Sequence, residues 1–223
     1  MKNLPTINQL NKALLKNPWD FSNEILYNLC KDNFLHNQHD IILTKVLFIG
    51  RIYAAAVERR KTKKTDINDN FYFDKVEPAF RESKLDEHLK RLMEVKSITS
   101  DKIPLILQTH YYLQRVLNRI TGLNKRSFCS KYLHFHLPDL FFIYDSRALM
   151  ALRNFITKVP KEFISVLQTK KIDMEYARFF CMCYQLKKQI EFKFDTTITT
   201  RQFDHILIEV ANKIMVKKQM KLY

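Results

Sequence analysis

Glycine and proline are scarce in this chain, which has only 2 glycines and 6 prolines among its 223 residues. Sheet proteins need many tight turns, and such turns depend on glycine and proline for backbone angles that other residues avoid. Hydrophobic residues make up 46% of the chain and aromatic residues 13%, a composition that excludes a disordered chain. We therefore expect an all-α fold, in one large domain or in two smaller interlocked helical subdomains around a cleft.

Apolar residues recur at helical spacing along most of the chain, and Thr6 is expected to cap the first helix. The periodicity predicts about nine or ten helices. They cover residues 7–15, 20–31, 39–61, 84–96, 101–119, 146–156, 161–168, 174–192 and 199 to the C-terminus, besides a short basic helix after Asn124.

The segment 39–61 is apolar around most of its circumference, so we expect it to run through the centre of the fold. Gly50 within it indicates a close neighbour. Arg51 and Glu58 lie on nearly the same helical face and are interpreted as a buried ion pair, although such a pair can also line a pocket. Residues 62–77 are expected to form a long connection. Three lysines at its start either contact backbone phosphates or lie in solvent: Lys61, Lys63 and Lys64.

The chain is strongly basic, with a net charge of +15 and a pI near 9.6. A basic surface gains from counterion release and from steering, so the charge favours a polyanionic partner, most economically nucleic acid. The alternative is a general bias towards lysine that serves solubility. The apolar run 41–57 is interrupted by Lys45 and Arg51, and is interpreted as a buried helix and not as a membrane span.

Neither a cofactor nor a metal is expected from the cysteines, because their positions lack zinc or iron–sulfur spacing. We interpret them as reduced core residues of a cytoplasmic protein. Three lysines break the apolar pattern of the N-terminus, so no secretory signal is expected: Lys2, Lys12 and Lys16. The four cysteines are Cys30, Cys129, Cys181 and Cys183.

A tight turn between two helices is predicted at Gly122, because glycine reaches positive φ angles without steric cost. Asn124 is the residue type that next best tolerates the left-handed region, so the two could shape a hairpin. The backbone N–H groups at the start of the following helix, beside Lys125 and Arg126, would then form a site for a phosphate-sized anion. The segment from Ser127 to His136 directly follows these two basic residues.

The run Ile120-Thr121-Gly122-Leu123-Asn124-Lys125-Arg126 resembles the hairpin of the helix-hairpin-helix DNA glycosylases, the superfamily of the 8-oxoguanine DNA glycosylases, whose motif is roughly Leu-Pro-Gly-hydrophobic-Gly-x-Lys. The segment Phe141 to Arg147 resembles the family's Pro-Val-Asp-x-His run, and Asp145 follows Arg126 by nineteen positions, about the family's separation. Three positions depart from the pattern. Thr121 replaces the proline, Asn124 the second glycine, and Arg126 stands where a bifunctional glycosylase has its nucleophilic lysine.

The resemblance implies a protein that extrudes a purine-type base from a DNA duplex and cleaves its N-glycosidic bond. A carboxylate beside the sugar stabilises the positive charge that forms, and Asp145 occupies that position. Its alternative role is that of a helix N-cap, and both roles can hold together. The resemblance also suggests bacterial proteins of this kind that are carried in antiviral operons.

Strand cleavage would require an amine that forms a Schiff base with the sugar. Arg126 is excluded, because a guanidinium stays protonated. Lys125 and Lys131 are the candidate nucleophiles, while phosphate contact or plain surface charge is the alternative for each. DNA contacts are expected from the hairpin and from the start of the helix after Asp145. The residues concerned are Gly122, Asn124, Lys125, Arg126, Ser127 and Arg147.

Several aromatic residues near the hairpin are candidates for a base-stacking pocket, although most of them are expected in the core. His134 and His136 lie two apart on a predicted helix and therefore on different faces, so each is interpreted as a core or capping histidine and not as a metal ligand. The pocket candidates are Arg51, Glu58, Tyr132, Phe135 and Tyr144, and Phe141 and Phe142 are further aromatic residues near the hairpin.

Two other functions remain open at the level of the sequence. A catalytically inactive module with the same fold would bind nucleic acid or a modified guanine, and the displaced lysine favours that interpretation. A helical interaction protein would instead use its basic charge to bind an acidic protein. The salt dependence of duplex binding separates these functions, because a protein that binds phosphates should lose affinity for the duplex steeply as the salt concentration rises.

Overall fold

The computed structural model describes residues 4–59 and 70–220, and within these ranges the chain is all-α, without a β-strand. The described residues form eleven α-helices with one π-helix and one 3-10 helix, slightly more elements than the periodicity predicts. The chain divides into two compact units, and each is built from segments that are separate in sequence. Unit 1 comprises residues 1–17, 142–169 and 174–223, and unit 2 comprises residues 18–141 and 170–173.

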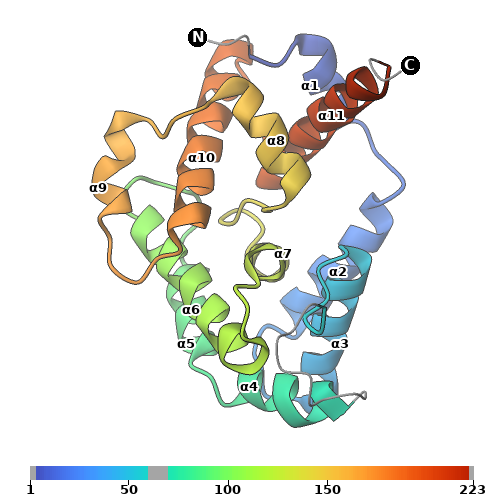
Figure 1. Ribbon diagram of the computed structural model, residues 1–223, viewed down its shortest axis with the longest axis vertical. Helices are drawn as coiled ribbons and strands as arrows, with labels where there is room; N and C mark the ends of the chain where they lie inside the picture. Colours follow the sequence, from blue (N-terminus) through green and yellow to red (C-terminus); the bar gives the residue numbers. More distant parts are fainter. Residues whose placement is uncertain (1–3, 60–69, 221–223) are drawn as a thin grey trace. The chain divides into compact units, whose positions relative to one another are not determined.

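Unit 2 is built around helix α7, Arg126–His136, which packs against α2, α3 and α6 (Figure 1). Every residue of α7 from Phe128 to His136 is buried. The other elements of the unit are α2 (Asp20–Asp32), α3 (His39–Ile52), η1 (Tyr72–Val76), α4 (Glu77–Arg81), α5 (Leu85–Met93) and α6 (Ile103–Thr121).

The central position predicted for residues 39–61 is taken by α7, and that prediction is wrong. Helix α3 has one buried face, while Phe48 and Ile52 on its other face are 47% and 40% exposed. A helix buried all round is usually apolar all round. Helix α7 instead carries polar side chains that find hydrogen-bond partners inside the protein, so its pattern did not reveal its burial.

Helix α3 ends nine residues before its predicted end because the chain turns back over Gly50. The amide of Ala55 donates to the carbonyl of Gly50 at 2.8 Å, and Ala54 has a φ of 51°. A Cβ on Gly50 would lie 3.2 Å from the Cα of Ala56, so the close neighbour expected at this glycine is present. The long connection predicted over 62–77 is wrong for its last part, because η1 and the start of α4 lie there. Lys61, Lys63 and Lys64 lie outside the described residues.

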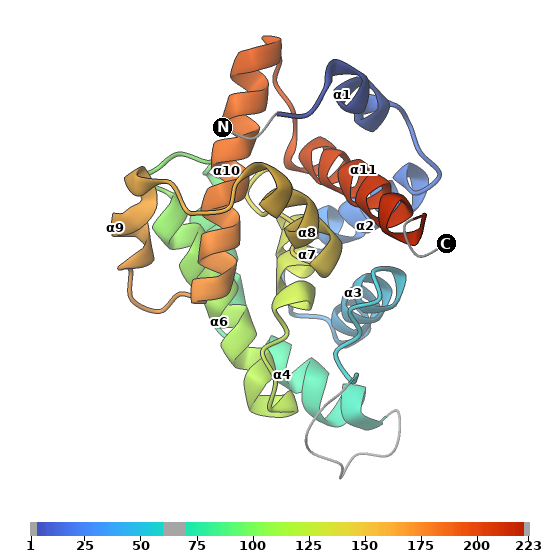
Figure 2. The same ribbon diagram turned by 45° about the horizontal axis from the view of Figure 1, so that its top comes forward.

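Unit 1 pairs the two ends of the chain, since α1 packs on α11 and α11 packs on α8 (Figure 2). Thr6 caps α1 in a capping box with Gln9, as predicted. Helix α10 contacts α8 and α9. The elements are α1 (Ile7–Leu14), α8 (Ser146–Phe155), η2 (Lys161–Phe163), α9 (Ile164–Leu167), α10 (Met174–Phe194) and α11 (Thr200–Gln219).

All four cysteines are buried and are free thiols, which agrees with their interpretation as core residues. Among the described residues, no helix combines the length and the apolar character that a bilayer crossing requires.

Candidate functional site

A four-residue turn joins α6 to α7 at the predicted hairpin. Gly122 caps α6 in the left-handed conformation, with a φ of 72°, and its amide donates to the carbonyl of Asn118 at 2.8 Å. The hydroxyl of Thr121 donates to the carbonyl of Leu117 and accepts from the amide of Leu123, at 2.8 and 3.2 Å. The turn predicted at Gly122 is therefore confirmed, and glycine is the residue that this conformation requires.

Asn124 shapes the turn through its side chain and not through its backbone. In the part of the chain that the structure describes, the non-glycine residues with positive φ are Ala54, Lys171 and Asp195, so the left-handed conformation considered for Asn124 is wrong. Its Oδ1 atom instead accepts from Asn118 Nδ2 at 3.2 Å, which ties the turn to the last turn of α6. Gly122 and Asn124 are both exposed at this edge of unit 2.

Arg126, the first residue of α7, points into unit 2 and pairs with Asp173. Its Nε and Nη2 atoms donate to the two carboxylate oxygens at 2.9 and 2.8 Å. The side chain of Asp173 is 5% exposed and that of Arg126 is 18% exposed. Gln114 on α6 also donates to Asp173. The guanidinium predicted to contact DNA is thus held in a largely buried ion pair that joins α7, α6 and residues 170–173.

His110 lies directly beside this ion pair, and its Nε2 atom is 3.4 Å from the carbonyl oxygen of Arg126. The pKa of His110 is lowered to about 3, chiefly by burial; the charge of Asp173 and the hydrogen bond to the Arg126 carbonyl oppose this shift, and the charge of Arg126 adds to it. The imidazole is therefore neutral at physiological pH. This residue did not figure among the predicted site residues, although it stands on the apolar face of a predicted helix.

The two candidate lysines are both engaged inside unit 2. Lys131 is 2% exposed, and its Nζ atom donates to the hydroxyl of Ser127, one turn earlier on α7, at 2.7 Å. Lys125 is less buried and donates to the carbonyl oxygen of Arg59. The structure thus brings Ser127 and Lys131 together, close to the start of α7.

Asp145 belongs to unit 1, where it caps α8. Its backbone is extended, and its Oδ1 atom accepts from the amide of Ala148 at 2.8 Å. The N-cap is therefore confirmed, whereas its part in stabilising a positive sugar stays a prediction. Tyr144 and Arg147 lie in the same unit, where Tyr144 donates to Glu175 and Arg147 donates to Asn212.

The remaining pocket candidates lie in different environments. Tyr132 and Phe135 are 0% and 1% exposed, so both are core residues of α7, as expected of most aromatic residues near the hairpin. Arg51 pairs with Glu58 at 2.7 Å, but its side chain is 59% exposed, so the prediction of a buried pair is wrong. Glu58 lies beyond the turn that follows α3. Its carboxylate pairs with Arg51 and also accepts a hydrogen bond from the hydroxyl of Tyr72.

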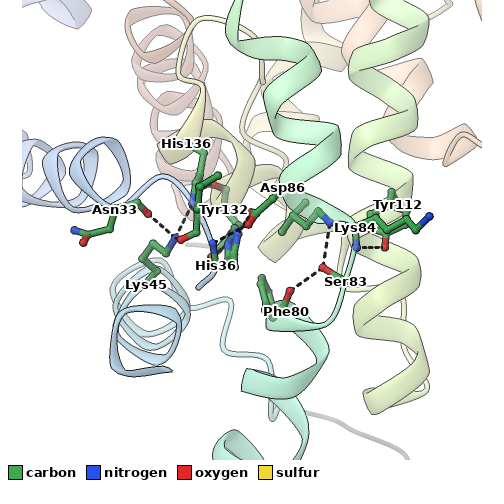
Figure 3. A network of polar contacts seen from close by, with 12 residues as sticks. Asn33, His36, Lys45, Phe80, Ser83, Lys84, Asp86, Tyr112, Tyr132 and His136 are labelled. Atoms are coloured by element: carbon green, nitrogen blue, oxygen red, sulfur yellow. Dashed lines mark hydrogen bonds and ion pairs between the residues drawn. The ribbon is translucent and has the colours of Figure 1, made fainter. Parts of the chain in front are cut away.

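A buried polar network that was not predicted from the sequence lies against α7 (Figure 3). His36 Nδ1 lies 2.5 Å from Asp86 Oδ1, and His36 Nε2 lies 2.6 Å from the hydroxyl of Tyr132. Lys45 is 0% exposed and donates to the carbonyl of Asn33 at 2.8 Å. These contacts tie α7 to α5, to α3 and to the loop after α2.

The imidazole of His136 completes this network. Its Nε2 atom is 3.3 Å from Lys45 Nζ, its Nδ1 atom is 2.8 Å from the carbonyl of Tyr132, and its ring stacks on that of His36. Burial lowers the pKa of Lys45 to about 8 and lowers the pKa of both histidines, and Lys45 adds to the shift of each histidine. One signal in the sequence could have revealed the network, because Lys45 interrupts an otherwise apolar run.

His134 is also a core residue, with Nδ1 2.9 Å from the carbonyl of Phe141 and Nε2 2.7 Å from the hydroxyl of Tyr27. His134 and His136 therefore confirm the interpretation of core histidines. Over residues 4–59 and 70–220, no three histidine, cysteine or acidic side chains gather as metal ligands.

Comparison of the chain with family models, with curated proteins and with solved structures found no match. The assignment of a function therefore depends on the residues of this chain.

Proposed function

We propose that the chain is a DNA-binding N-glycosylase of the helix-hairpin-helix type, which acts on an extruded purine-type base such as 8-oxoguanine. The observation that carries the proposal is the glycine-capped turn between α6 and α7. Its exposed residues, Gly122 and Asn124, lie just before the N-terminus of a buried helix in a chain of net charge +15. A helix N-terminus favours a phosphate through its backbone N–H groups and its dipole.

Two lysines remain candidates for the amine that attacks the sugar, and their environments favour them for different reasons. Lys131 lies beside Ser127 in the first turns of α7, and its amine would be the nucleophile if the substrate reaches it there. Lys125 stands at the turn itself and is the more accessible of the two. Asp145 would stabilise the positive sugar, and its place at the start of α8, where its carboxylate accepts from the amide of Ala148, is compatible with that function.

The alternative is a catalytically inactive module that binds nucleic acid or a modified guanine. The state of Arg126 favours it, since the residue at the family's lysine position is fixed in an ion pair with Asp173. A protein that had kept the fold only for binding would have no need of an amine there.

A borohydride-trapping assay on duplexes that contain 8-oxoguanine or an abasic site tests the enzyme directly. The wild type is compared with Lys125→Gln, Lys131→Gln and Asp145→Asn. The last variant is informative because asparagine caps a helix about as well as aspartate, so it removes the charge and preserves α8. Lys31→Gln on α2 removes the same charge at an exposed position and serves as the control.

The proposal expects a trapped complex that one lysine variant abolishes, and base release that Asp145→Asn reduces by about a hundredfold or more. If the wild type binds duplex and yields neither a trapped complex nor a free base, the inactive module is the better account. Duplex affinity should fall steeply with salt in either case. An affinity that does not change with salt would argue against DNA binding altogether.

A further inference from the structure

Unit 1 has a groove of its own, which is separate from the hairpin and has no role in the proposed function. The groove has a volume of about 570 Å³ and lies between α10 and the segment that follows α8. One side of the groove carries Lys158 and the apolar residues Phe155, Ile156 and Pro160, and residues of α10 line the other side.

One stripe of α10 supplies the polar wall of this groove. Gln185, Gln189 and Lys193 are spaced four residues apart, which places them on a single face of the helix, and Phe192 lines the groove beside them. The opposite wall is mostly apolar. A volume of this size, with apolar walls and a few polar groups, is typical of a pocket for a small molecule.

Two features of the lining restrict the chemistry of a ligand. The Oε1 atom of Gln185 is buried and receives no hydrogen bond from the described residues, so a ligand that donates an N–H group would satisfy it. Lys158 and Lys193 line the groove, and no acidic residue of the described chain lines it with them. The groove therefore favours a negative group.

The exposed aromatic residue at the groove adds a third restriction. Phe192 is 92% exposed, an unusual state for a phenylalanine, and its ring is available to stack on a planar ligand. A fatty acid would match the apolar wall and the lysines, but it has no N–H group for Gln185. A nucleoside phosphate has a planar base with N–H donors and a negative phosphate in one molecule.

We propose that this groove binds a free mononucleotide, with its base against Phe192 and Gln185 and its phosphate near Lys158 and Lys193. The amides of Gln185 and Gln189 each offer a donor and an acceptor, which is the pattern that a base edge requires. The site would serve as a second function of the chain, independent of the hairpin.

Isothermal titration calorimetry on the full chain tests the proposal with five probes: AMP, GMP, adenosine, inorganic phosphate and oleate. Lys193→Gln removes one charge and Gln185→Leu removes the buried acceptor. Lys213→Gln on α11 is the matched control, because this exposed lysine belongs to the same unit and lies outside the groove lining. Both groove variants are checked for helical content by circular dichroism.

At least one mononucleotide should bind, and adenosine and phosphate should each bind more weakly than AMP. Lys193→Gln and Gln185→Leu should weaken nucleotide binding by about tenfold each, because the first removes an interaction with the phosphate and the second removes one hydrogen bond to the base. Lys213→Gln should leave it unchanged.

Three results would overturn the proposal. One is the absence of binding by both mononucleotides, and a second is binding of oleate alone, which would indicate a lipid-type anion. The third is nucleotide binding that Lys193→Gln does not affect but that Lys125→Gln weakens, because the nucleotide would then occupy the hairpin. Failure of the glycosylase assay has no bearing on these results, so the two proposals are tested separately.

Discussion

Arg126 illustrates how one buried side chain can hold several elements together. It begins α7, and its partner Asp173 lies 47 residues later and also accepts from Gln114 on α6. The attraction between two charges with low exposure is strong, but each charge has lost most of its contact with water. The pair therefore depends on the presence of both members.

Removal of this guanidinium should be costly. We expect Arg126→Met to lower the free energy of unfolding by about 3–5 kcal/mol, because the carboxylate of Asp173 is left buried without a countercharge. Arg51→Met removes the same side chain from a pair in which the arginine is 59% exposed, and should cost less than about 1 kcal/mol. Urea denaturation followed by circular dichroism measures both. Equal losses of unfolding free energy in the two variants would show that the Arg126–Asp173 pair stabilises the fold no more than the exposed Arg51–Glu58 pair does.

At the scale of the element, helix ends connect the fold to the proposed chemistry. Gly122 ends α6 in a conformation that glycine adopts easily, and Asp145 begins α8 with a side-chain cap. Each feature was predicted from the sequence, because caps depend on residues within one turn of the helix end. The extent of α3 was not, because the chain turns back over Gly50 and packs Ala56 against it.

Two variants separate the capping hydrogen bond of Asp145 from the negative charge of its side chain. Asp145→Ala should lower the free energy of unfolding by about 1 kcal/mol, because the amide of Ala148 loses its acceptor. Asp145→Asn should be nearly neutral for stability, since asparagine is an equally good cap. Thermal denaturation of the two variants distinguishes them. If Asp145→Asn lost as much unfolding free energy as Asp145→Ala, the negative charge itself would stabilise the fold. A lower rate of base release in Asp145→Asn could then reflect lost stability.

At the scale of the whole molecule, the histidines with lowered pKa values all lie in unit 2. Burial is the main cause at His36, His110 and His136, and the pKa of His110 falls to about 3. In the unfolded chain these groups would titrate near pH 6.5. Between the two pKa values the unfolded state binds more protons than the folded state, so acid favours unfolding.

The contribution of these histidines to the free energy of unfolding should therefore be fully present above pH 6.5 and should fall as the pH decreases below that value. The loss approaches about 1.4 kcal/mol per pH unit for each histidine that stays neutral in the fold. Urea denaturation at a series of pH values measures the slope. His110→Gln should flatten it, because the variant removes one buried imidazole from the titration. An unchanged slope in His110→Gln would contradict the lowered pKa.

Local patterns in the amino-acid sequence were enough to predict the helical class, the approximate positions of most helices, the cap at Thr6 and the turn at Gly122. These features depend on periodicity and on backbone preferences that act within a few residues. The tertiary structure decided which helix is central, where Arg126 points, and which groups surround Lys45. His36 meets Asp86 across 50 residues and Tyr132 across 96. Burial and hydrogen bonding between such distant positions depend on packing, and the local pattern of a polar-looking helix such as α7 does not encode them.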